Sequence, residues 1–280
     1  MDGIILINKE KGLTSRDVVN KVCKKLNTRK VGHTGTLDPI ATGLMVLCIG
    51  EGLKLVELLT HHDKEYIAKV KLGIKTDTYD VTGTIIEENN DISLDKEKLV
   101  NTLNSFIGEY SQTVPIYSSI KVNGKKLYEY AREGKVVELP KHLVKISDIS
   151  LLELTSDSFT FKVTVSSGTY IRSLINDIGE KLSMPMAMEE LKRTRVGEYK
   201  LEDATVVDDL RIIPIIDAIN IKKVEVDSTL LKKVANGVIL DNSYQSDNIM
   251  FTYNNKPISI YKDSNGKLKS YRVFNLKDEC

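Results

Sequence analysis

The segment from Val31 to Leu53 constrains the fold more than any other part of the chain. It reads VGHTGTLDPIATGLMVLCIGEGL, and its five glycines allow the backbone to turn tightly or to let another backbone approach closely. The continuous apolar run from Leu44 to Ile49 has the length of a buried strand. We therefore expect a glycine-rich loop that leads directly into the core of the protein.

One acidic side chain, Asp38, lies in the middle of this loop, between uncharged neighbours and directly before Pro39. A carboxyl group held on a stiff turn against the core is often adapted to catalysis. A plainer interpretation is that Asp38 caps a short helix whose first position is Pro39, which is a common arrangement. For an isolated Asp-Pro pair, the plainer interpretation is the stronger one.

Composition indicates an ordinary globular protein. The chain has 280 residues, of which 41% are hydrophobic and 28% charged, enough for one large domain or for a large and a small one. No apolar run approaches a membrane span, and the N-terminus lacks the pattern of a signal peptide. Cys23, Cys48 and Cys280 lack metal-ligand spacing, and the first two lie among apolar residues. We expect buried thiols, no metal site and a cytoplasmic location.

Positive charge is concentrated near the N-terminus, although the net charge of the chain is only +1. Residues 1–75 carry 13 Lys and Arg against 8 Asp and Glu. Several of these basic residues crowd just ahead of the glycine-rich segment: Lys21, Lys24, Lys25, Arg29 and Lys30. Contact with a nucleic acid would explain the cluster, but so would a solvated helix end, because lysines suit helix C-termini.

The run GHTGTLDPIATGLMVLCIGEGLK resembles the signature segment of the TruB family, the tRNA pseudouridine-55 synthases. The match is long and contiguous, so it is far more specific than a short motif. In that family the aspartate of the matching Leu-Asp-Pro is the catalytic residue, and the resemblance therefore implies that Asp38 is catalytic. It also implies a role for His33, in the same segment, in binding the RNA substrate.

The residues before this segment predict a strand, a turn and a helix. Ile4–Ile7 is a short buried strand, and Thr14 with Asp17 forms a capping box that starts an amphipathic helix. The family pattern at the intervening turn is Lys-Pro-x-Gly, and here Glu10 occupies the position of the proline. The resemblance implies an RNA-binding role for Lys9.

A strand is predicted from Tyr66 to Leu72, since apolar residues alternate there with polar ones. Tyr66 on its inner face would ordinarily be a core residue. By resemblance, Lys64-Glu65-Tyr66 matches the motif whose tyrosine stacks on the target base. The acids of the following Thr-Asp-Thr-Tyr-Asp segment are typical turn formers, and the resemblance implies that Asp80 helps to position the pocket.

After a helix expected from about Asp95 to Ile107, the run PIYSSIKVNGKKLYEYAREG begins at Pro115. It is basic and carries three tyrosines, which suits both phosphate contact and base stacking. It resembles the RNA-gripping insertion of the family, with Ser119 in place of the usual alanine. We expect this insertion at about 110–145, with Lys125 and Lys126 binding RNA. An ordinary hairpin plus an exposed helix is the alternative.

Two strands, Leu143–Leu154 and Phe159–Val165, are predicted to form a hairpin before the motif SGTYIRSL and an amphipathic helix. Arg172 falls in the first turn of that helix, where a cation works against the helix dipole. An anionic partner would explain the placement, and an exposed arginine tolerated at small cost is the alternative. The resemblance implies that Arg172 pairs with Asp38, that Tyr170 contacts the substrate and that Leu191 lines the pocket.

The predicted architecture is α+β, with two domains. Residues 1–215 should form the pseudouridine synthase fold, a mixed and mostly antiparallel sheet with flanking helices. Residues 222–280 contain short alternating stretches with turn signals at Asn236-Gly237, Asn254-Asn255 and Asn265-Gly266, which predict a small all-β unit. By position this tail resembles the β-rich, PUA-like C-terminal domain of bacterial family members.

The resemblance implies isomerisation of the T-loop uridine of tRNA, position 55, to pseudouridine. This reaction is redox-neutral and occurs at a carbon electrophile, so no metal or organic cofactor is expected. The expected partner is the T-arm of tRNA, with no membrane, and the protein should be a monomer. Asp38 is expected to act on a nucleotide whose base has left its stack, by attack at C1′ of the ribose, attack at C6 of the uracil or removal of the 2′ proton.

Two alternatives come from other functional classes. A non-catalytic RNA-binding or RNA-folding module would keep the basic segments, but it has no use for Asp38 facing a polyanion. A glycoside hydrolase would use a carboxylate at a sugar carbon, but that chemistry usually needs two carboxylates across one bond. The presence of one dominant acid together with Arg172 favours the synthase.

Overall fold

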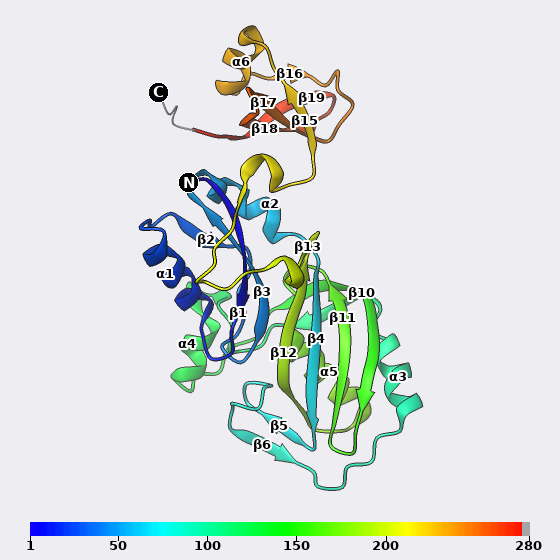
Figure 1. Ribbon diagram of the computed structural model, residues 1–280. Helices are drawn as coiled ribbons and strands as arrows, with labels where there is room; N and C mark the ends of the chain where they lie inside the picture. The colour runs from blue at the N-terminus through cyan, green and yellow to red at the C-terminus, as the bar shows by residue number, and fades with distance from the viewer. Residues whose placement is uncertain (276–280) are drawn as a thin grey trace.

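The computed structural model describes residues 1–275, in which a ten-stranded sheet and a five-stranded sheet are joined by a short connection (Figure 1). The larger sheet has ten strands: β1 (Gly3–Lys9), β2 (Val31–His33), β3 (Thr42–Ile49), β4 (Lys64–Leu72), β7 (Gly108–Thr113), β10 (Lys141–Leu154), β11 (Ser158–Val165), β12 (Met186–Val196), β13 (Tyr199–Lys200) and β14 (Ile212–Pro214). Two small hairpins lie outside it: β5 (Ile74–Thr76) with β6 (Ile85–Glu88), and β8 (Lys121–Val122) with β9 (Lys125–Lys126).

The ten-stranded sheet consists of two halves that meet at one parallel contact. Its main path runs β14-β1-β3-β12-β4-β11-β10-β7, and every pair of neighbours except β3 and β12 is antiparallel. The parallel contact joins only Thr42 to Lys192 and Gly43 to Arg193. In Figure 1 the two halves splay apart from this junction. The glycine-rich loop that precedes β3 therefore lies where the halves meet.

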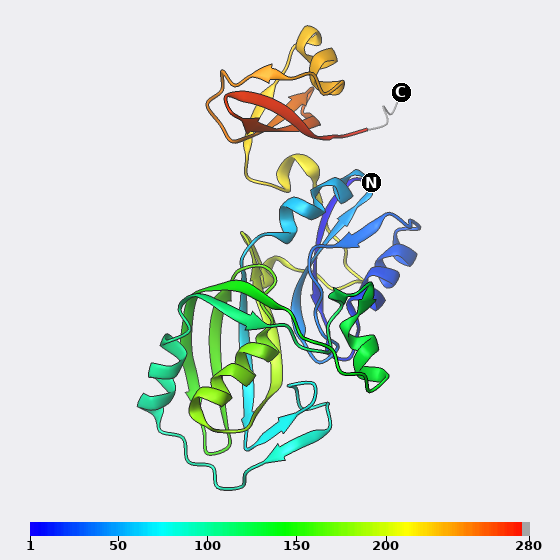
Figure 2. The same ribbon diagram turned by 180° about the vertical axis from the view of Figure 1, so that it is seen from behind.

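Helices cover the sheet unevenly. Their bounds are α1 (Ser15–Lys25), α2 (Val56–Thr60), α3 (Lys96–Asn104), α4 (Leu127–Arg132), α5 (Ile171–Leu182) and α6 (Ser228–Ala235), with single 3₁₀ segments at Gly50–Leu55, Leu201–Asp203 and Ile215–Asp217. Figure 2 shows α3 and α5 on one face of the larger half of the sheet, whereas α1 lies beside β2. The helix α4 belongs to the segment between β7 and β10, which projects from the sheet beside α1.

Three apolar clusters form the core. The first lies between one face of the sheet and the helices α1, α3 and α5, and the second lies on the opposite face of β1 and β3. These two central strands are buried on both faces, which explains their continuous apolar sequences. The third cluster is the interior of the C-terminal sheet.

Most of the local predictions for residues 1–215 are confirmed. Strands contain Ile4–Ile7 and Leu44–Ile49, β4 alternates between buried and half-buried residues, and Thr14 and Asp17 form the predicted capping box. The helix expected from about Asp95 to Ile107 spans Lys96–Asn104, with Asp95 as its N-cap and Ser105 as its C-cap. Cys48 is buried and Cys23 half-buried, and Cys280 lies outside the described residues.

The C-terminal unit is β-rich, but it is not all-β as predicted. The helix α6 connects the first two of its five strands. The strands are β15 (Lys222–Glu225), β16 (Leu240–Asp241), β17 (Asn248–Tyr253), β18 (Lys256–Ser264) and β19 (Lys267–Val273). Asp227 caps α6 by accepting hydrogen bonds from two backbone N–H groups of its first turn. In residues 1–275, no helix has the length and apolar character needed to cross a membrane.

Candidate active site

The loop from 34 to 41 is fixed from the side of α1. The hydroxyl of Ser15, the first residue of that helix, donates a hydrogen bond to the carbonyl of Leu37 (2.9 Å) and accepts one from its N–H (2.8 Å). The Leu37 side chain is 3% exposed and belongs to the first apolar cluster. The residue before Asp38 is therefore held by its backbone and by its side chain.

Asp38 itself lies in a β-turn. The N–H of Ala41 donates to the carbonyl of Asp38 (3.0 Å), with Pro39 at the second position of the turn, where its fixed φ is favourable. No helix begins there, so the interpretation of Asp38 as a helix cap is wrong. The carbonyl of Pro39 accepts a hydrogen bond from the N–H of Gly12 (2.7 Å), which joins this turn to the turn that follows β1.

Arg193 on β12 supports the same loop from within the sheet junction. Its side chain is 1% exposed, and its guanidinium donates to the carbonyls of Leu44 (2.7 Å), Gly35 (3.1 Å) and Thr36 (3.4 Å). Gly43 packs against the Arg193 backbone with a φ of +101°, and a Cβ there would lie 2.3 Å from the Arg193 carbonyl oxygen. The junction therefore requires glycine at this position.

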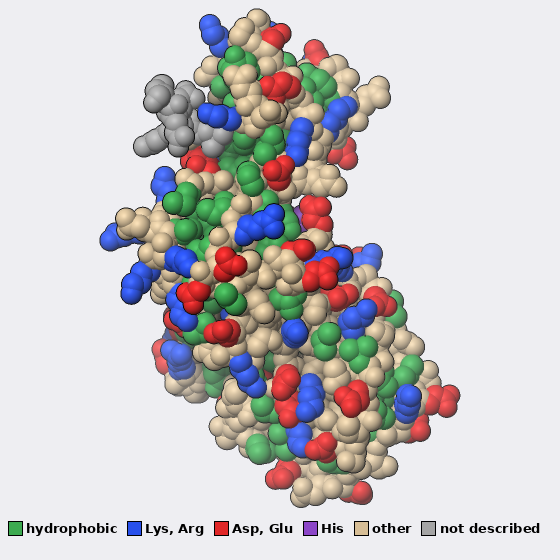
Figure 3. Space-filling model, in the orientation of Figure 1, with side chains coloured by type: hydrophobic (Ala, Val, Ile, Leu, Met, Phe, Trp, Pro, Cys, Tyr) green, Lys and Arg blue, Asp and Glu red, His purple; other side chains and the backbone are tan. Residues whose placement is uncertain are grey.

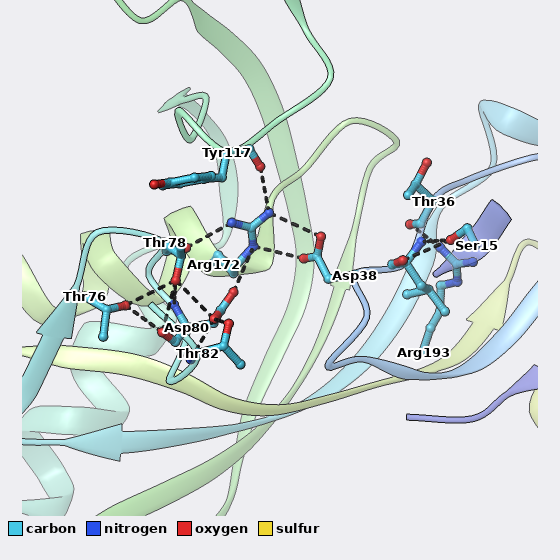
Figure 4. Close-up of polar contacts among 11 residues, drawn as sticks. Ser15, Thr36, Asp38, Thr76, Thr78, Asp80, Thr82, Tyr117, Arg172 and Arg193 are labelled. Carbon is cyan, nitrogen blue, oxygen red and sulfur yellow. Dashed lines mark hydrogen bonds and ion pairs between the residues drawn. The ribbon is translucent and has the colours of Figure 1, made fainter. Parts of the chain in front are cut away.

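Arg172 reaches Asp38 from the first turn of α5. Its Nε lies 2.9 Å from one Asp38 carboxylate oxygen, and its Nη2 lies 3.3 Å from the other (Figure 4). This bidentate geometry fixes the direction of the carboxylate as well as its position. The Arg172 side chain is 7% exposed and that of Asp38 36%, so the acid faces the solvent side of the pair.

The remaining donors of Arg172 are directed at two other segments. Nη1 donates to the carbonyl of Thr78 (2.9 Å), and Nη2 donates to the carbonyl of Tyr117 (3.1 Å). The buried Asp80 carboxylate lies 4.0 Å from Nε and accepts hydrogen bonds from the Thr82 N–H and the Thr78 hydroxyl. The interpretation of Arg172 as an exposed arginine is therefore wrong.

A pocket of about 380 Å³ opens beside this pair. Asp38 and Arg172 form one part of its wall, and Tyr66, Tyr170 and Leu191 line other parts. Tyr66 is 6% exposed, and among the described residues its hydroxyl has no hydrogen-bond partner. The pocket thus combines an oriented carboxylate with apolar and aromatic walls, a combination that suits a planar, polar ring.

Lys9 and His33, both predicted to bind RNA, do not line this pocket. The Lys9 side chain is 1% exposed, and its ammonium donates to the carbonyls of Glu10 (3.0 Å) and Leu13 (2.7 Å). Burial lowers the pKa of Lys9 to about 8. His33 is half-buried at the end of β2, and burial also lowers its pKa. The geometry of Lys9 suits support of the turn before α1.

The comparisons with known proteins agree with this arrangement. The sequence model of the N-terminal domain of TruB family pseudouridylate synthases matches residues 23–171, just over half of the chain. The chain belongs to the TruB family. The tRNA pseudouridine synthase B of Bacillus subtilis (strain 168) is 41% identical, in an alignment that covers 100% of this chain and 99% of that protein. That of Fusobacterium nucleatum subsp. nucleatum is 49% identical and covers 72% and 70% respectively.

Solved structures show the same fold at low sequence identity. The Cbf5 complex with Nop10 and Gar1 superposes with a TM-score of 0.72 at 22% identity, covering 97% of this chain and 85% of the other. An H/ACA RNP bound to a substrate RNA containing 2′-deoxyuridine gives a TM-score of 0.71, also at 22% identity. The predicted α+β fold, with its mostly antiparallel sheet and β-rich tail, is therefore confirmed.

In this TruB family member the insertion reaches the pocket. Tyr128 of α4 lines the pocket together with Tyr117, Ser118 and Ser119. The Lys125 ammonium lies 5.0 Å from the centre of the Tyr130 ring and pairs with a nearby glutamate. Lys126 lies over the Tyr128 ring at 5.4 Å. The two lysines thus lie beside aromatic rings on the segment next to the pocket.

Two buried basic residues of the pocket wall were missed by the sequence analysis as site residues. Arg193 was counted only among the basic residues of its segment, and Lys64 only as part of a strand motif. The Lys64 ammonium donates to the carbonyls of Thr60 (2.9 Å) and His62 (2.7 Å), and burial with the nearby Arg193 charge lowers the Lys64 pKa to about 8. A basic residue on an inward-facing strand position was the available signal in both cases.

Proposed function

We propose that this chain converts uridine to pseudouridine in tRNA, at position 55 of the T-loop. The observation that carries the proposal is the Asp38 carboxylate, held by two donors of Arg172 at the wall of a pocket that Tyr66 and Leu191 also line. Membership of the TruB family and relatives named tRNA pseudouridine synthase B support the reaction and the class of RNA.

The reaction rearranges bonds without changing the oxidation state. The bond between N1 of uracil and C1′ of ribose breaks, the ring turns, and a bond forms between C5 and C1′. C5 loses a proton, and N1 ends with one. The balance is complete without an external oxidant, reductant or co-substrate, so the protein has to supply orientation, electrostatic stabilisation and proton transfer.

Asp38 is the group that acts on the substrate in this proposal. Its carboxylate is oriented by Arg172, and its 36% exposure leaves it accessible from the pocket. An oxygen in this position can attack C1′, attack C6 or take the 2′ proton, and the isomerisation requires one of these three steps. Because Arg172 also bonds to the carbonyls of Thr78 and Tyr117, the pair is fixed before the substrate binds.

The walls of the pocket suit a base that has left its stack. The ring of Tyr66 and the side chain of Leu191 offer an aromatic and an aliphatic surface to an extruded uracil. The hydroxyl of Tyr66, which has no hydrogen-bond partner within residues 1–275, can relay the proton that leaves C5, accepting it while its own proton passes to solvent. Tyr170 and Asp80 complete the proposed site, Tyr170 at the pocket wall and Asp80 behind Arg172.

The RNA is gripped by the insertion in this proposal. Lys125 and Lys126 supply charge beside the rings of Tyr130 and Tyr128, so the segment can contact phosphates and stack on exposed bases. The protein recognises the folded T-arm, because sequence-specific RNA recognition by proteins targets loops whose bases are unstacked. We propose that the protein acts as a monomer in the cytoplasm, with residues 222–280 as a PUA-like domain beside the catalytic domain 1–215.

Mapping of pseudouridine in an unmodified tRNA transcript tests the proposal. The purified protein should form pseudouridine at position 55, and a transcript with cytidine at that position should remain unchanged. Asp38→Asn should abolish turnover in single-turnover assays and keep the dissociation constant for tRNA within about tenfold, since one hydrogen-bonding group replaces another. Product formation by Asp38→Asn at an appreciable rate would remove Asp38 from catalysis. A wild-type protein that binds tRNA without forming product would favour the RNA-binding module.

A further inference from the structure

The start of α5 has no side-chain cap of its own. Its N-cap residue, Tyr170, makes no capping hydrogen bond through its side chain, although Arg172 follows only two residues later. A helix end without a cap leaves backbone groups without partners and tends to fray. The position of the Arg172 guanidinium depends on this first turn, so another part of the structure has to hold it.

Gln112, on β7, supplies this support. Its side-chain oxygen accepts a hydrogen bond from the Tyr170 N–H (2.8 Å), and its side-chain nitrogen donates to the Tyr170 carbonyl (3.1 Å). The same nitrogen lies 2.5 Å from the Tyr110 hydroxyl, and Gln112 is 1% exposed. The amide therefore pairs with both backbone groups of Tyr170, as a neighbouring strand would, in a site closed to water.

The next residue of β7 holds the other side of Arg172. The hydroxyl of Ser173 donates to the carbonyl of Thr113 (2.9 Å). Arg172 thus lies between two residues, Tyr170 and Ser173, that are both bonded to β7. Arg172 also donates to the Tyr117 carbonyl. Hydrogen bonds therefore hold the first turn of α5, which carries Arg172, against both β7 and the insertion that follows it.

We propose that Gln112 is a positioning residue for pseudouridine formation. It holds the first turn of α5 so that the Arg172 guanidinium can bond to both oxygens of the Asp38 carboxylate. The inference rests on the proposed function, because it takes the Asp38–Arg172 pair as the catalytic one. Gln112 acts only through Arg172 and lies outside the lining of the pocket. A misplacement of about 1 Å in a catalytic group can cost a factor of about 100 in rate.

An amide suits this position for a chemical reason. One donor and one acceptor on the same planar group are needed to pair with the N–H and the carbonyl of one residue, and glutamine provides both. Gln112→Met keeps the length of the side chain and removes both hydrogen bonds. Gln112→Glu keeps an acceptor for the Tyr170 N–H but places a second oxygen against the Tyr170 carbonyl.

Single-turnover kinetics with saturating full-length protein and tRNA transcript test the proposal. Gln112→Met should lower the rate by about 10- to 100-fold, with the dissociation constant for tRNA unchanged within about threefold. Gln112→Glu should also be slow and carries the test if Gln112→Met does not fold. A control for general loss of stability is Val144→Ala, at a 2% exposed position of β10 opposite Tyr110, which should lower the melting temperature and leave the rate near that of the wild type.

A double-mutant cycle separates positioning from a merely structural role. If Gln112 works through Arg172, Gln112→Met should cost much less in an Arg172→Lys background, because the fork that it holds is already lost. Rates of the Gln112 variants equal to the wild type, equal losses in both backgrounds, or a loss confined to tRNA affinity would each overturn the inference. Failure of the proposed function looks different, since the wild type would then form no pseudouridine or Asp38→Asn would remain active.

Discussion

Arg172 shows how one residue can connect segments that are distant in the sequence. Its guanidinium bonds to Asp38 in the glycine-rich loop, to Thr78 in the turn after β5 and to Tyr117 in the insertion. A cation in the first turn of α5 is unfavourable with respect to the helix dipole. These three contacts outweigh that cost, which is at most about 1 kcal/mol for an ordinary surface position.

Replacement of Arg172 by lysine tests the need for a planar fork. Arg172→Lys keeps the charge but cannot bond to both Asp38 oxygens and to two carbonyls, so the single-turnover rate should fall by at least about tenfold. Arg195→Lys, on β12 and outside the pocket, is the control for the same substitution and should keep the wild-type rate. A near-wild-type rate for Arg172→Lys would limit the role of Arg172 to its charge.

Tyr66 allows stacking and proton transfer to be separated. Its ring lines the pocket, and its hydroxyl has no hydrogen-bond partner in residues 1–275. Tyr66→Phe keeps the ring face, so a rate loss of about 100-fold or more with normal tRNA binding would assign the C5 proton to the hydroxyl, and this is the result that we expect. Tyr66→Leu should be poor in either case, because base stacking worth about 1–3 kcal/mol is lost with the ring. A Phe variant at nearly full speed would leave Tyr66 with stacking alone.

At the scale of elements, the insertion offers a test of RNA contact. Replacement of Lys125 and Lys126 by alanine should weaken tRNA binding and reduce the slope of log affinity against log salt by about one per lost phosphate contact. The pair Lys96 and Lys98 on α3, remote from the pocket, provides a control with the same change in charge. An unchanged slope for the Lys125 and Lys126 variant would exclude phosphate contact by these residues.

Elements with a local signal could be predicted from the sequence. The alternation of β4 appears directly in the burial of its residues, and the Thr14–Asp17 capping box lies within a few residues of the helix that it starts. Asp38, Tyr66, Leu191 and Arg172 were predicted as site residues because whole motifs resemble those of a family, and the fold brings these four side chains to one pocket.

Apart from the Asp38–Arg172 pair, which the family resemblance implied, features that depend on contacts between distant residues were not predicted. The parallel junction of β3 and β12 joins residues about 150 positions apart, and the demand for glycine at Gly43 comes from the Arg193 backbone across it. The pairing of Gln112 with Tyr170 is equally remote in sequence. The helix α6 was missed for another reason, since the turn signal Asn236-Gly237 at the end of this short helix resembles the turn signals between strands.

At the scale of the whole molecule, the C-terminal sheet shares a core with the catalytic part. Met250, Ile260 and Phe274 belong to the same apolar cluster as Leu44 and Cys48 of β3. Figure 3 shows green hydrophobic side chains gathered on this face where the tail meets the rest of the chain. Polar contacts surround this shared cluster: Lys54 donates to the Val273 carbonyl (2.6 Å), and Arg272 pairs with Glu57.

A shared core predicts that the two parts unfold together. Calorimetry of the wild type should give one transition, with equal calorimetric and van't Hoff enthalpies. Phe274→Ala removes a side chain, 5% exposed, from the shared cluster and should cost about 3–5 kcal/mol, which weakens the coupling and splits the transition in two. Phe251→Ala, inside the separate cluster of the tail, is the matched control.

The two phenylalanine variants distinguish a docked tail from an independent one. Phe251→Ala destabilises the tail without touching the shared cluster, so it should lower the melting temperature of a transition that remains single. If the wild type already unfolds in two steps, or if Phe274→Ala changes neither the number of transitions nor their temperatures, the shared cluster does not couple the parts. If the two parts are coupled, the tail keeps a fixed position relative to the pocket. An RNA that contacts both the tail and the pocket then has to span one fixed distance.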